Sequence, residues 1–371
     1  MRILHCLRAP VGGLFRHVLD LAVEQAKRGH DVGILADSNA EDRLTDSKFA
    51  NVAPALTLGV LRTPMGRRPG FSDYAAARTV TAHARGLKLD VLHGHGAKGG
   101  AYARLAARQV KREGQSVKAF YTPHGGTLNF KPSTLEGRVF LKLERVLEQF
   151  TDGLIFESAY AARVYKERVS ATDVPKRIIP NGLQPDDFIR PDPIADATDI
   201  LFIGELRDIK GVDVLLEALS VLNKSRRVTA TIVGAGPDDA KLKARCPELG
   251  LNDCVKFTGA LPARDAFRLG RIMVVPSLAE SFPYVVLEAA AAGLPLIATS
   301  VGGIPEIVYG TDTALIEPGA PQPLVDALNA VLDDPAAATA RAKNLRANVA
   351  EKFTVAAMTS AVLDFYALTA R

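Results

Sequence analysis

Two glutamates, Glu280 and Glu288, stand on either side of an expected turn between a strand and a helix. An apolar run at 272–275 precedes them, and an Ala-rich run follows. Glu280 is therefore expected in the loop after the strand, and Glu288 inside the helix. Ligands of open α/β sheets bind at this end of the strands, where a helix N-terminus attracts phosphate. Because ionised carboxylates accept hydrogen bonds, the pair is suited to binding hydroxyl groups of a nucleotide-sugar.

Short apolar runs, typical of buried strands, alternate with runs of helical periodicity along the whole chain. In the first half we expect strands at 3–7, 32–36, 90–93, 119–122 and 153–156. In the second half we expect strands at 200–203, 230–233, 254–257, 272–275 and 295–298. Strands that alternate with helices in this way predict parallel sheets covered on both faces. The predicted fold class is therefore α/β.

Two domains are expected, because 371 residues exceed one ordinary hydrophobic core. Turn-forming residues concentrate between 180 and 193, where the apolar periodicity is weak. We therefore expect Rossmann-like domains at 1–185 and 195–354, with the boundary near 180–198. A further helical run at 355–368 follows the second domain.

The composition, with 47% hydrophobic and 23% charged residues, is that of a soluble globular protein. No apolar stretch approaches 18 residues, and the N-terminus runs straight into a strand. Neither a transmembrane helix nor a signal peptide is therefore expected. The three cysteines show no metal-ligand spacing and favour a reduced, cytoplasmic setting.

Basic residues concentrate in the first half, where residues 1–190 hold 29 Lys and Arg against 19 Asp and Glu. A predicted amphipathic helix at 131–150 interleaves basic residues with an apolar stripe of Leu135, Val139, Leu143, Val146 and Phe150. These features favour peripheral contact with the inner face of an anionic membrane. The alternative is that the stripe packs on its own domain and the basic residues are merely solvated. Nucleic acid is not an expected partner, because the chain has no Trp and only 6% aromatic residues.

Several segments, in chain order, share the pattern of one family. Among them are "YTPHGG" at 121–126, "GELRDIKGVDVLLEAL" at 204–219 and "PSLAESFPYVVLEAAAAGLPLIATSVGGIPEIV" at 276–308. Together they resemble the retaining GT-B glycosyltransferases of family 4 (group 1). The resemblance covers nearly the whole chain. It implies two Rossmann-like domains facing across a cleft, with the run at 355–371 crossing back onto the N-terminal domain.

The resemblance implies an activity: transfer of a hexose-type sugar from a nucleoside-diphosphate sugar to an acceptor hydroxyl, with retention at the anomeric carbon. It implies no cofactor, and a saccharide or lipid-linked acceptor in polysaccharide, lipopolysaccharide or glycolipid assembly. The donor would bind mainly to the C-terminal domain and the acceptor to the basic N-terminal domain. A GT-B-fold nucleotide-sugar epimerase is the main alternative. A phosphorylase and a non-catalytic nucleotide or nucleic-acid binder are further alternatives.

The same resemblance assigns roles in the C-terminal domain. Glu280 would bind hydroxyls of the transferred sugar, Glu288 the ribose diol, and the backbone amides of Val285 and Val286 a phosphate oxygen. Lys210 and Arg207 would neutralise the diphosphate leaving group. The chain departs from the family here, because Glu205 stands where many members have arginine and Arg207 comes two positions later. The alternatives are that both glutamates are ordinary exposed helix residues and that Arg207 is a solvated loop residue.

In the N-terminal domain the resemblance points to a glycine turn and a histidine. Gly12 and Gly13 lack side chains, so the backbone can approach the donor phosphate or close on the acceptor. His124 would hydrogen-bond the donor sugar near its reacting carbon, with a structural role as the alternative.

No metal is expected. His93, His95 and His17 are weaker functional candidates than His124. His93 and His95 have metal-like spacing, but no Asp, Glu or Cys accompanies them to complete a site. The chain also has no Asp-x-Asp motif, which favours stabilisation of the leaving group by Lys210 rather than by a divalent ion.

Overall fold

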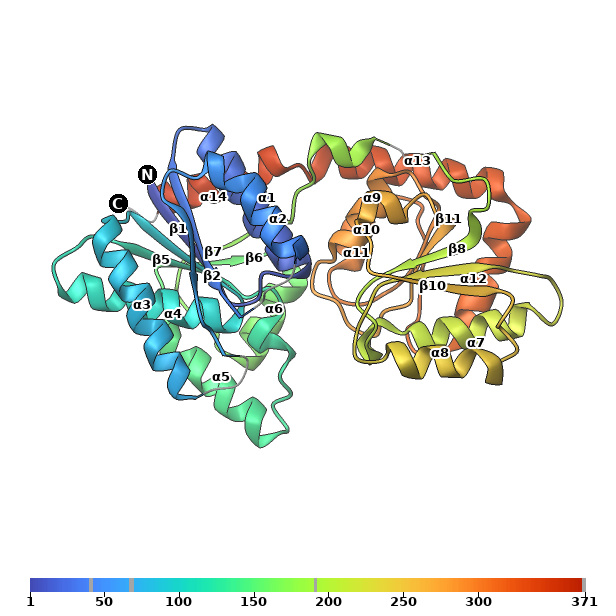
Figure 1. The fold of residues 1–371 in the computed structure, drawn as a ribbon, viewed down its shortest axis with the longest axis horizontal. Helices are drawn as coiled ribbons and strands as arrows, with labels where there is room; N and C mark the ends of the chain where they lie inside the picture. The colour runs from blue at the N-terminus through green and yellow to red at the C-terminus, as the bar shows by residue number, and fades with distance from the viewer. Residues whose placement is uncertain (40–42, 67–69, 190–191, 369–371) are drawn as a thin grey trace. The chain divides into compact units, whose positions relative to one another are not determined.

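The computed structural model describes residues 1–39, 43–66, 70–189 and 192–368, which form two α/β units (Figure 1). The first unit comprises Met1–Gly182 and Val355–Arg371, and the second comprises Leu183–Thr354. The division between Gly182 and Leu183 lies within the range 180–198 where the sequence predicts the domain boundary. Both units contain parallel sheets with helices on their faces, so the predicted α/β class is confirmed.

The first unit has a seven-stranded parallel sheet in the order β3-β2-β1-β4-β5-β6-β7. Its strands are β1 Arg2–Leu7, β2 Asp31–Asp37, β3 Gly59–Thr63, β4 Val91–His95, β5 Lys118–Thr122, β6 Gly153–Phe156 and β7 Lys176–Ile178. Its helices are α1 Gly12–Lys27, α2 Arg43–Val52, α3 Phe71–Leu87, α4 Gly96–Arg112, α5 Leu135–Glu148, α6 Ala159–Arg168 and α14 Val355–Leu368.

Alternating residues of β1 build two separate cores on the two faces of this sheet. Ile3 and Leu7 pack with residues of α1 and α14, whereas Leu4 and Cys6 pack with residues of α3 and α4. A strand that is buried on both faces reads as a continuous apolar run, which is why the sequence predicts it well. His5 lies on the same face of β1 as Ile3 and Leu7.

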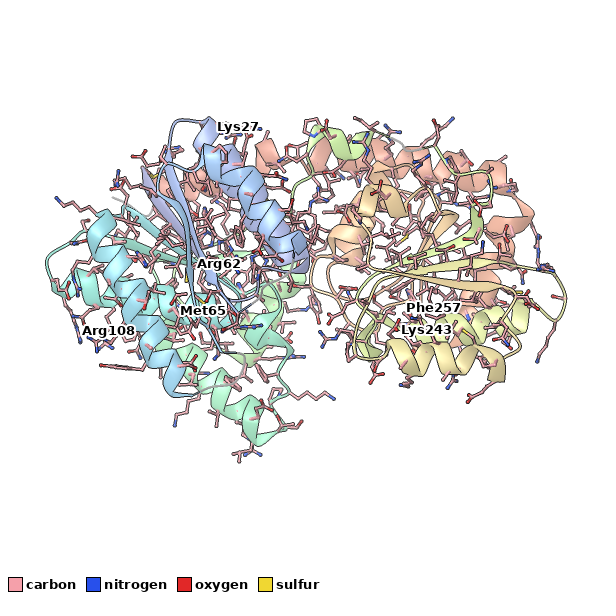
Figure 2. All side chains as sticks on the ribbon, in the orientation of Figure 1. Lys27, Arg62, Met65, Arg108, Lys243 and Phe257 are labelled. Carbon is pink, nitrogen blue, oxygen red and sulfur yellow. The ribbon has the colours of Figure 1, made fainter. Side chains whose placement is uncertain are left out.

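The second unit has a six-stranded parallel sheet in the order β10-β9-β8-β11-β12-β13. Its strands are β8 Thr198–Ile203, β9 Ala230–Val233, β10 Val255–Gly259, β11 Gly270–Val275, β12 Leu296–Thr299 and β13 Leu315–Ile316. Its helices are α7 Val212–Leu222, α8 Asp239–Glu248, α9 Ala263–Ala266, α10 Tyr284–Ala291, α11 Ile304–Val308, α12 Pro321–Asp333 and α13 Pro335–Lys352. Side chains fill the layers of each unit, and Lys243 lies 5.8 Å from the centre of the Phe257 ring (Figure 2).

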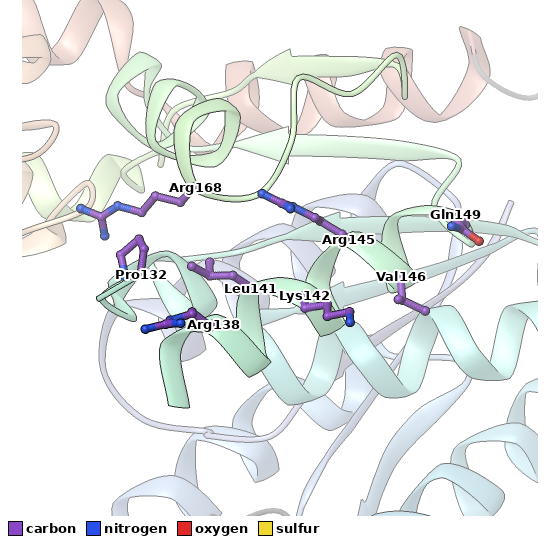
Figure 3. Close-up of a pocket in the computed structure, with 8 residues that line it drawn as sticks. All are labelled: Pro132, Arg138, Leu141, Lys142, Arg145, Val146, Gln149 and Arg168. Carbon is purple, nitrogen blue, oxygen red and sulfur yellow. The ribbon is translucent and has the colours of Figure 1, made fainter. Parts of the chain in front are cut away.

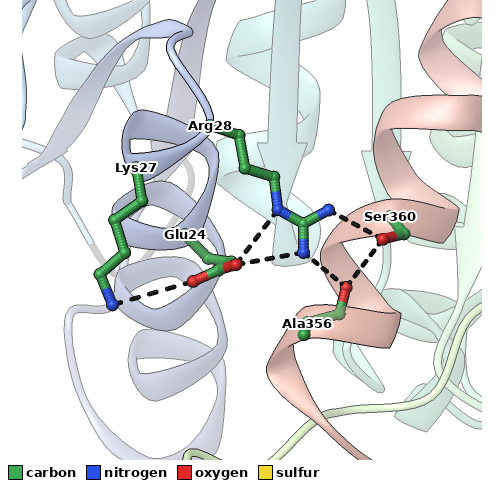
Figure 4. A network of polar contacts seen from close by, with 5 residues as sticks. All are labelled: Glu24, Lys27, Arg28, Ala356 and Ser360. Carbon is green, nitrogen blue, oxygen red and sulfur yellow. Dashed lines mark hydrogen bonds and ion pairs between the residues drawn. The ribbon is translucent and has the colours of Figure 1, made fainter.

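The C-terminal helix α14 is held to the first unit by a polar network at the end of α1 (Figure 4). The guanidinium of Arg28 donates to Glu24 Oε1 at 3.1 Å, to Ser360 Oγ at 2.8 Å and to the Ala356 carbonyl at 2.8 Å. Farther along α14, Tyr366 OH lies 2.6 Å from His93 Nδ1 on β4. These contacts join segments more than 270 residues apart in the sequence.

Helix α5 is anchored through one face, which combines apolar packing with a buried ion pair. Its buried residues are Gly137, Leu141 and Glu144, and Glu144 pairs with Arg104 of α4. Both charged side chains are almost completely buried, with exposures of 1% and 0%. The Arg104 guanidinium also lies 3.9 Å from the centre of the Tyr121 ring. Burial alone would lower the Arg104 pKa, but Glu144 outweighs it and the pKa is raised.

Removing one charge of this buried pair should destabilise the protein, because the remaining charge would have no counterion. We expect Glu144→Gln to lower the free energy of unfolding by about 3–5 kcal/mol. The double variant Arg104→Met with Glu144→Leu should recover most of that loss. Urea unfolding followed by circular dichroism measures both values. Glu167→Gln, which breaks the exposed pair of Arg163 and Glu167, is the control and should cost well under about 1 kcal/mol. A double variant as unstable as the single one would contradict the expectation.

Candidate functional site

Lys210 and Glu280 follow two neighbouring strands of the second sheet. Lys210 ends a 3₁₀ turn, Asp208–Lys210, between β8 and α7, and Glu280 lies in the loop between β11 and α10. The chain passes from β8 outward to β9 and β10, then returns to β11 on the other side of β8. The gap between the ends of β8 and β11 is therefore the topological switch point, where ligands of such sheets bind.

The two side chains form an ion pair at this point. Lys210 Nζ lies 2.6 Å from Glu280 Oε1, and Ser277 Oγ donates to the same oxygen at 2.7 Å. The Glu280 side chain is 8% exposed and that of Lys210 is 21% exposed, so the pair is mostly shielded from water. Two hydrogen bonds to one oxygen fix the carboxylate in place, and the ammonium remains partly accessible.

Glycines allow the surrounding loops to approach closely. Gly211 has φ +65°, and a Cβ there would lie 2.1 Å from the Pro276 carbonyl oxygen. Gly302 has φ +60°, and a Cβ there would lie 2.0 Å from the Glu280 carbonyl oxygen. Any side chain would force these loops apart. In addition, the Leu278 amide donates to the Ile209 carbonyl at 2.8 Å, which ties the Lys210 loop to the Glu280 loop.

Glu288 lies on α10 and is half-buried. It lines a pocket of about 100 Å³, whose other lining residues are Asp186, Asp187, Ile189, Ala263, Arg264, Phe267 and Ala292. Neither Lys210 nor Glu280 belongs to this lining. Glu280 thus lies in the loop before α10, whereas Glu288 lies in the second half of that helix and faces different neighbours.

The start of α10 presents backbone amides near the loop that carries Glu280. Helix α10 begins at Tyr284, so Val285 and Val286 lie in its first turn. The Val286 amide already donates to the Pro283 carbonyl at 3.2 Å, and the Val286 side chain is completely buried. Val285 is only partly buried. A phosphate at this helix end would therefore compete with Pro283 for the Val286 amide.

Arg207 lies in the same loop as Lys210 but differs in its surroundings. Its guanidinium pairs with Glu205 at 3.4 Å, and the two side chains are 47% and 55% exposed. Exposed pairs of this kind contribute little stability, so the arginine can exchange partners at small cost.

In the first unit, Gly12 opens helix α1 with φ +63°. A Cβ at Gly12 would meet no atom within 4 Å, so the glycine serves the backbone conformation rather than a close internal contact. Gly12 and Gly13 are both exposed. The turn therefore leaves backbone open to a ligand at a helix N-terminus.

Five of the seven histidines cluster in the first unit. They are His5 of β1, His17 of α1, His93 and His95 of β4, and His124 of the loop after β5. His5 and His93 are register partners in neighbouring strands. The sequence alone does not identify His5 as a candidate site residue, because a single histidine in an apolar strand forms no recognisable motif.

Ring nitrogens in this cluster lie close enough to share a ligand. Two sets of three, His5 with His93 and His95, and His17 with His95 and His124, have nitrogens within 4.8 Å of one another. In the sequence no Asp, Glu or Cys accompanies His93 and His95, whereas the fold brings further imidazoles next to them.

Burial lowers the pKa of every histidine in the cluster. The pKa values of His5 and His17 fall to about 4, opposed by hydrogen bonds to Gln25 and Asn181 respectively. The pKa values of His93, His95 and His124 lie well below the usual range, first through burial and then through the neighbouring histidines. All five rings are therefore neutral at pH 7.

Comparison with known families gives two matches that together cover most of the chain. The profile described as Glycosyltransferase Family 4 matches residues 11–187, and that described as Glycosyl transferases group 1 matches residues 197–334. A glycogen synthase of Mycobacterium tuberculosis is 29% identical over 95% of this chain and 91% of its own length. A D-inositol 3-phosphate glycosyltransferase of Corynebacterium jeikeium is 28% identical over 87% of this chain and 84% of its own.

Solved structures with GT-B folds are similar along the whole chain. Sucrose-phosphate synthase from Thermosynechococcus elongatus superposes with a TM-score of 0.81 at 21% identity, covering 99% of both chains. Anabaena HepE, solved with UDP and glucose, superposes with a TM-score of 0.84 at 19% identity, covering 99% of this chain and 100% of its own. At this identity the likeness establishes the fold.

Proposed function

Because the chain belongs to glycosyltransferase family 4 (group 1), we propose that it is a retaining, metal-independent hexosyltransferase that uses a nucleoside-diphosphate sugar. The acceptor is a saccharide or lipid-linked hydroxyl in polysaccharide, lipopolysaccharide or glycolipid assembly. The observation that carries this proposal is the ion pair of Lys210 and Glu280 at the switch point of the second sheet.

This pair provides the two interactions that binding a nucleotide-sugar requires, one with the diphosphate and one with the sugar. A diphosphate carries more negative charge than one carboxylate, so it competes well for the Lys210 ammonium. Sugar hydroxyls can in turn donate to the Glu280 carboxylate. When the bond to the sugar breaks, charge grows on the diphosphate, and Lys210 stabilises it without reorganising. Arg207 adds a second cation once it leaves Glu205.

The remaining predicted residues take complementary roles in the proposal. Glu288 anchors the ribose diol, and the amides of Val285 and Val286 hold a phosphate oxygen at the start of α10. Gly12 and Gly13 supply open backbone for phosphate or acceptor. His124 hydrogen-bonds the transferred sugar.

A donor panel tests the activity. Purified protein is incubated with UDP-, GDP- and ADP-hexoses, with and without saccharide and lipid-linked acceptors, and with excess EDTA. We expect one donor to give acceptor-dependent diphosphate release, unaffected by EDTA, and a product whose anomeric configuration by NMR matches the donor. Isomerisation of the donor without an acceptor would instead establish the epimerase. Failure with every donor and acceptor would contradict the assignment.

A specific observation also supports peripheral membrane contact by the proposed enzyme. Four apolar residues of α5 point outward, with exposures of 78% for Leu135, 50% for Val139, 49% for Leu143 and 46% for Val146. The alternative, a helix packed on its own domain, holds for the inner face of α5 but not for these four residues. The helix turns them outward because Gly137, Leu141 and Glu144 occupy its inner face.

Cationic side chains border the exposed stripe. A pocket of about 480 Å³ beside α5 is lined by Arg138, Lys142, Arg145 and Arg168, together with Pro132, Leu141, Val146 and Gln149 (Figure 3). Apolar residues flanked by cations match the interface of an anionic bilayer. None of the helices within the described ranges is long and apolar enough to span a membrane.

Removing apolar residues from the stripe should weaken binding to anionic lipid. We expect Val139→Ser with Leu143→Ser to reduce binding to phosphatidylglycerol-containing vesicles by about tenfold or more, since each loses buried apolar area. Vesicle sedimentation at low and high salt measures the effect. Val221→Ser, an exposed position on α7 of the second unit, is the control. Equal binding by the double variant and the wild type would exclude α5 as the membrane contact.

A further inference from the structure

We propose that Gln25, His5 and His95 form a hydrogen-bonded chain that fixes the tautomer of His124 and presents its Nδ1 as an acceptor for a sugar hydroxyl. The three residues are positioning residues for His124. The role of the sugar hydroxyl rests on the proposed function, whereas the fixed tautomer is a property of the protein alone.

The chain runs through three histidines, of which His5 and His95 use both ring nitrogens and His124 uses only Nε2. His5 Nε2 lies 2.8 Å from Gln25 Oε1, and His5 Nδ1 lies 3.0 Å from His95 Nε2. His95 Nδ1 in turn lies 3.0 Å from His124 Nε2. Gln25, His5 and His95 are at most 1% exposed, and His124 is half-buried. The chain therefore leads from the core to a ring that a ligand can reach.

The buried end determines the direction of every bond. A neutral imidazole carries one N–H and one bare nitrogen. Since Gln25 Oε1 can only accept, His5 carries its hydrogen on Nε2 and accepts on Nδ1. His95 must then donate from Nε2 and accept on Nδ1. His124 must donate from Nε2, which leaves its Nδ1 bare.

The pKa shifts support this assignment. Protonation of His5 or His95 would turn both nitrogens of that ring into donors and break the chain, and protonation of His124 would remove its bare Nδ1. Burial is the first cause that lowers the pKa of His5, His95 and His124. The neighbouring rings of His17 and His93 disfavour a charge on His95 further.

The backbone at His124 gives an independent indication that its position matters. His124 has φ +49°, in the left-handed region that residues other than glycine seldom adopt. Strain of this kind persists where surrounding contacts hold the residue, and it concentrates at functional sites. Here the contacts are the bond that His124 donates to His95 Nδ1 and the edge of the His17 ring, whose centre lies 4.7 Å from that of His124.

The tautomer of His17 is also fixed by a side-chain amide, but His17 does not belong to the hydrogen-bonded chain. Its Nδ1 lies 2.9 Å from Asn181 Oδ1, which fixes the hydrogen on Nδ1. Its Nε2 is buried and has no hydrogen-bond partner among the described residues. His17 therefore contributes packing against His124, while the chain through His95 sets the tautomer.

Selective ¹⁵N-histidine labelling and two-dimensional NMR at pH 7.5 test the inference directly. In the wild type we expect one set of His124 resonances with hydrogen on Nε2 and a bare Nδ1. In His95→Leu, and in the more remote Gln25→Leu, we expect His124 to show a mixture of tautomers. His95→Gln, which retains a donor and an acceptor, should restore much of the wild-type pattern. His83→Leu is the control, since His83 lies on α3, outside the cluster.

Activity gives the second readout. With a donor identified, His95→Leu should lower kcat about tenfold or more, with His95→Gln less affected and His83→Leu retaining kcat. A tautomer mixture in the wild type, or an unchanged His124 tautomer in His95→Leu, would overturn the inference. So would stoichiometric transition metal in the purified protein bound through His17, His95 and His124. Absence of transferase activity would leave the NMR result decisive and would count only against the proposed function.

Discussion

Replacing Lys210 with methionine should lower kcat for sugar transfer by about 10²- to 10³-fold. Methionine keeps most of the length of the side chain but removes the charge that would stabilise the leaving diphosphate. The structure places this ammonium 2.6 Å from Glu280, where the connections that follow β8 and β11 lead to opposite sides of the sheet. Glu280→Gln should cause a loss of similar size, because an amide accepts sugar hydroxyls less strongly than a carboxylate. Initial rates of diphosphate release at saturating donor measure both effects.

A matched control separates this role from a general loss of charge. Lys241 pairs with Asp208 in the same loop region at 3.2 Å, but the two side chains are 60% and 78% exposed. Lys241→Met should therefore retain kcat within about twofold. If Lys210→Met retained activity to the same degree, the assignment of the leaving-group site would be wrong.

The first unit should lose stability steeply as the pH falls from about 6.5 towards 4. His5 and His17 have pKa values of about 4 in the folded chain, against 6.5 for an exposed histidine. Above pH 6.5 both states are uncharged and stability is complete. Below it the unfolded chain binds protons that the folded chain does not, so the free energy of unfolding falls by about 1.4 kcal/mol per pH unit for each such histidine.

Urea unfolding followed by circular dichroism at pH 7.5, 6.5, 5.5 and 4.5 measures this slope. We expect a loss on the order of several kcal/mol between pH 6.5 and 4.5. His17→Asn should reduce the slope by about the share of one histidine, whereas His83→Asn on α3, outside the cluster, should leave it unchanged. Stability that is flat from pH 6.5 to 4.5 would show that the cluster is accessible to protons in the folded state.

The sequence predicts the central strands and the edge strand β10 but misses the edge strands β3, β7 and β13, for a physical reason. Strands β1, β4, β8 and β11 are buried on both faces and appear as apolar runs. Strand β3 is mostly half-buried and β7 has only three residues, two of them exposed, so neither carries a strong apolar signal. Neither strand was among those expected.

The candidate site was predictable in its residue types but not in its contacts. Lys210 and Glu280 are 70 residues apart, and only the strand order shows that their loops meet. His5 and His95 are 90 residues apart, so nothing local indicates their hydrogen bond. For α5, the periodicity identifies the apolar stripe but not its direction. That direction depends on the pairing of Glu144 with Arg104 on another helix.

The central claim is that Lys210 holds the diphosphate and Glu280 the sugar of one donor. Calorimetric titration of wild type, Lys210→Met and Glu280→Gln with a nucleoside diphosphate and with the corresponding nucleotide-sugar tests it most directly. We predict that Lys210→Met binds both ligands about tenfold or more weakly. Glu280→Gln should bind the diphosphate at least as tightly as the wild type but should lose affinity for the nucleotide-sugar. Unchanged affinity of Lys210→Met for the diphosphate would contradict the claim.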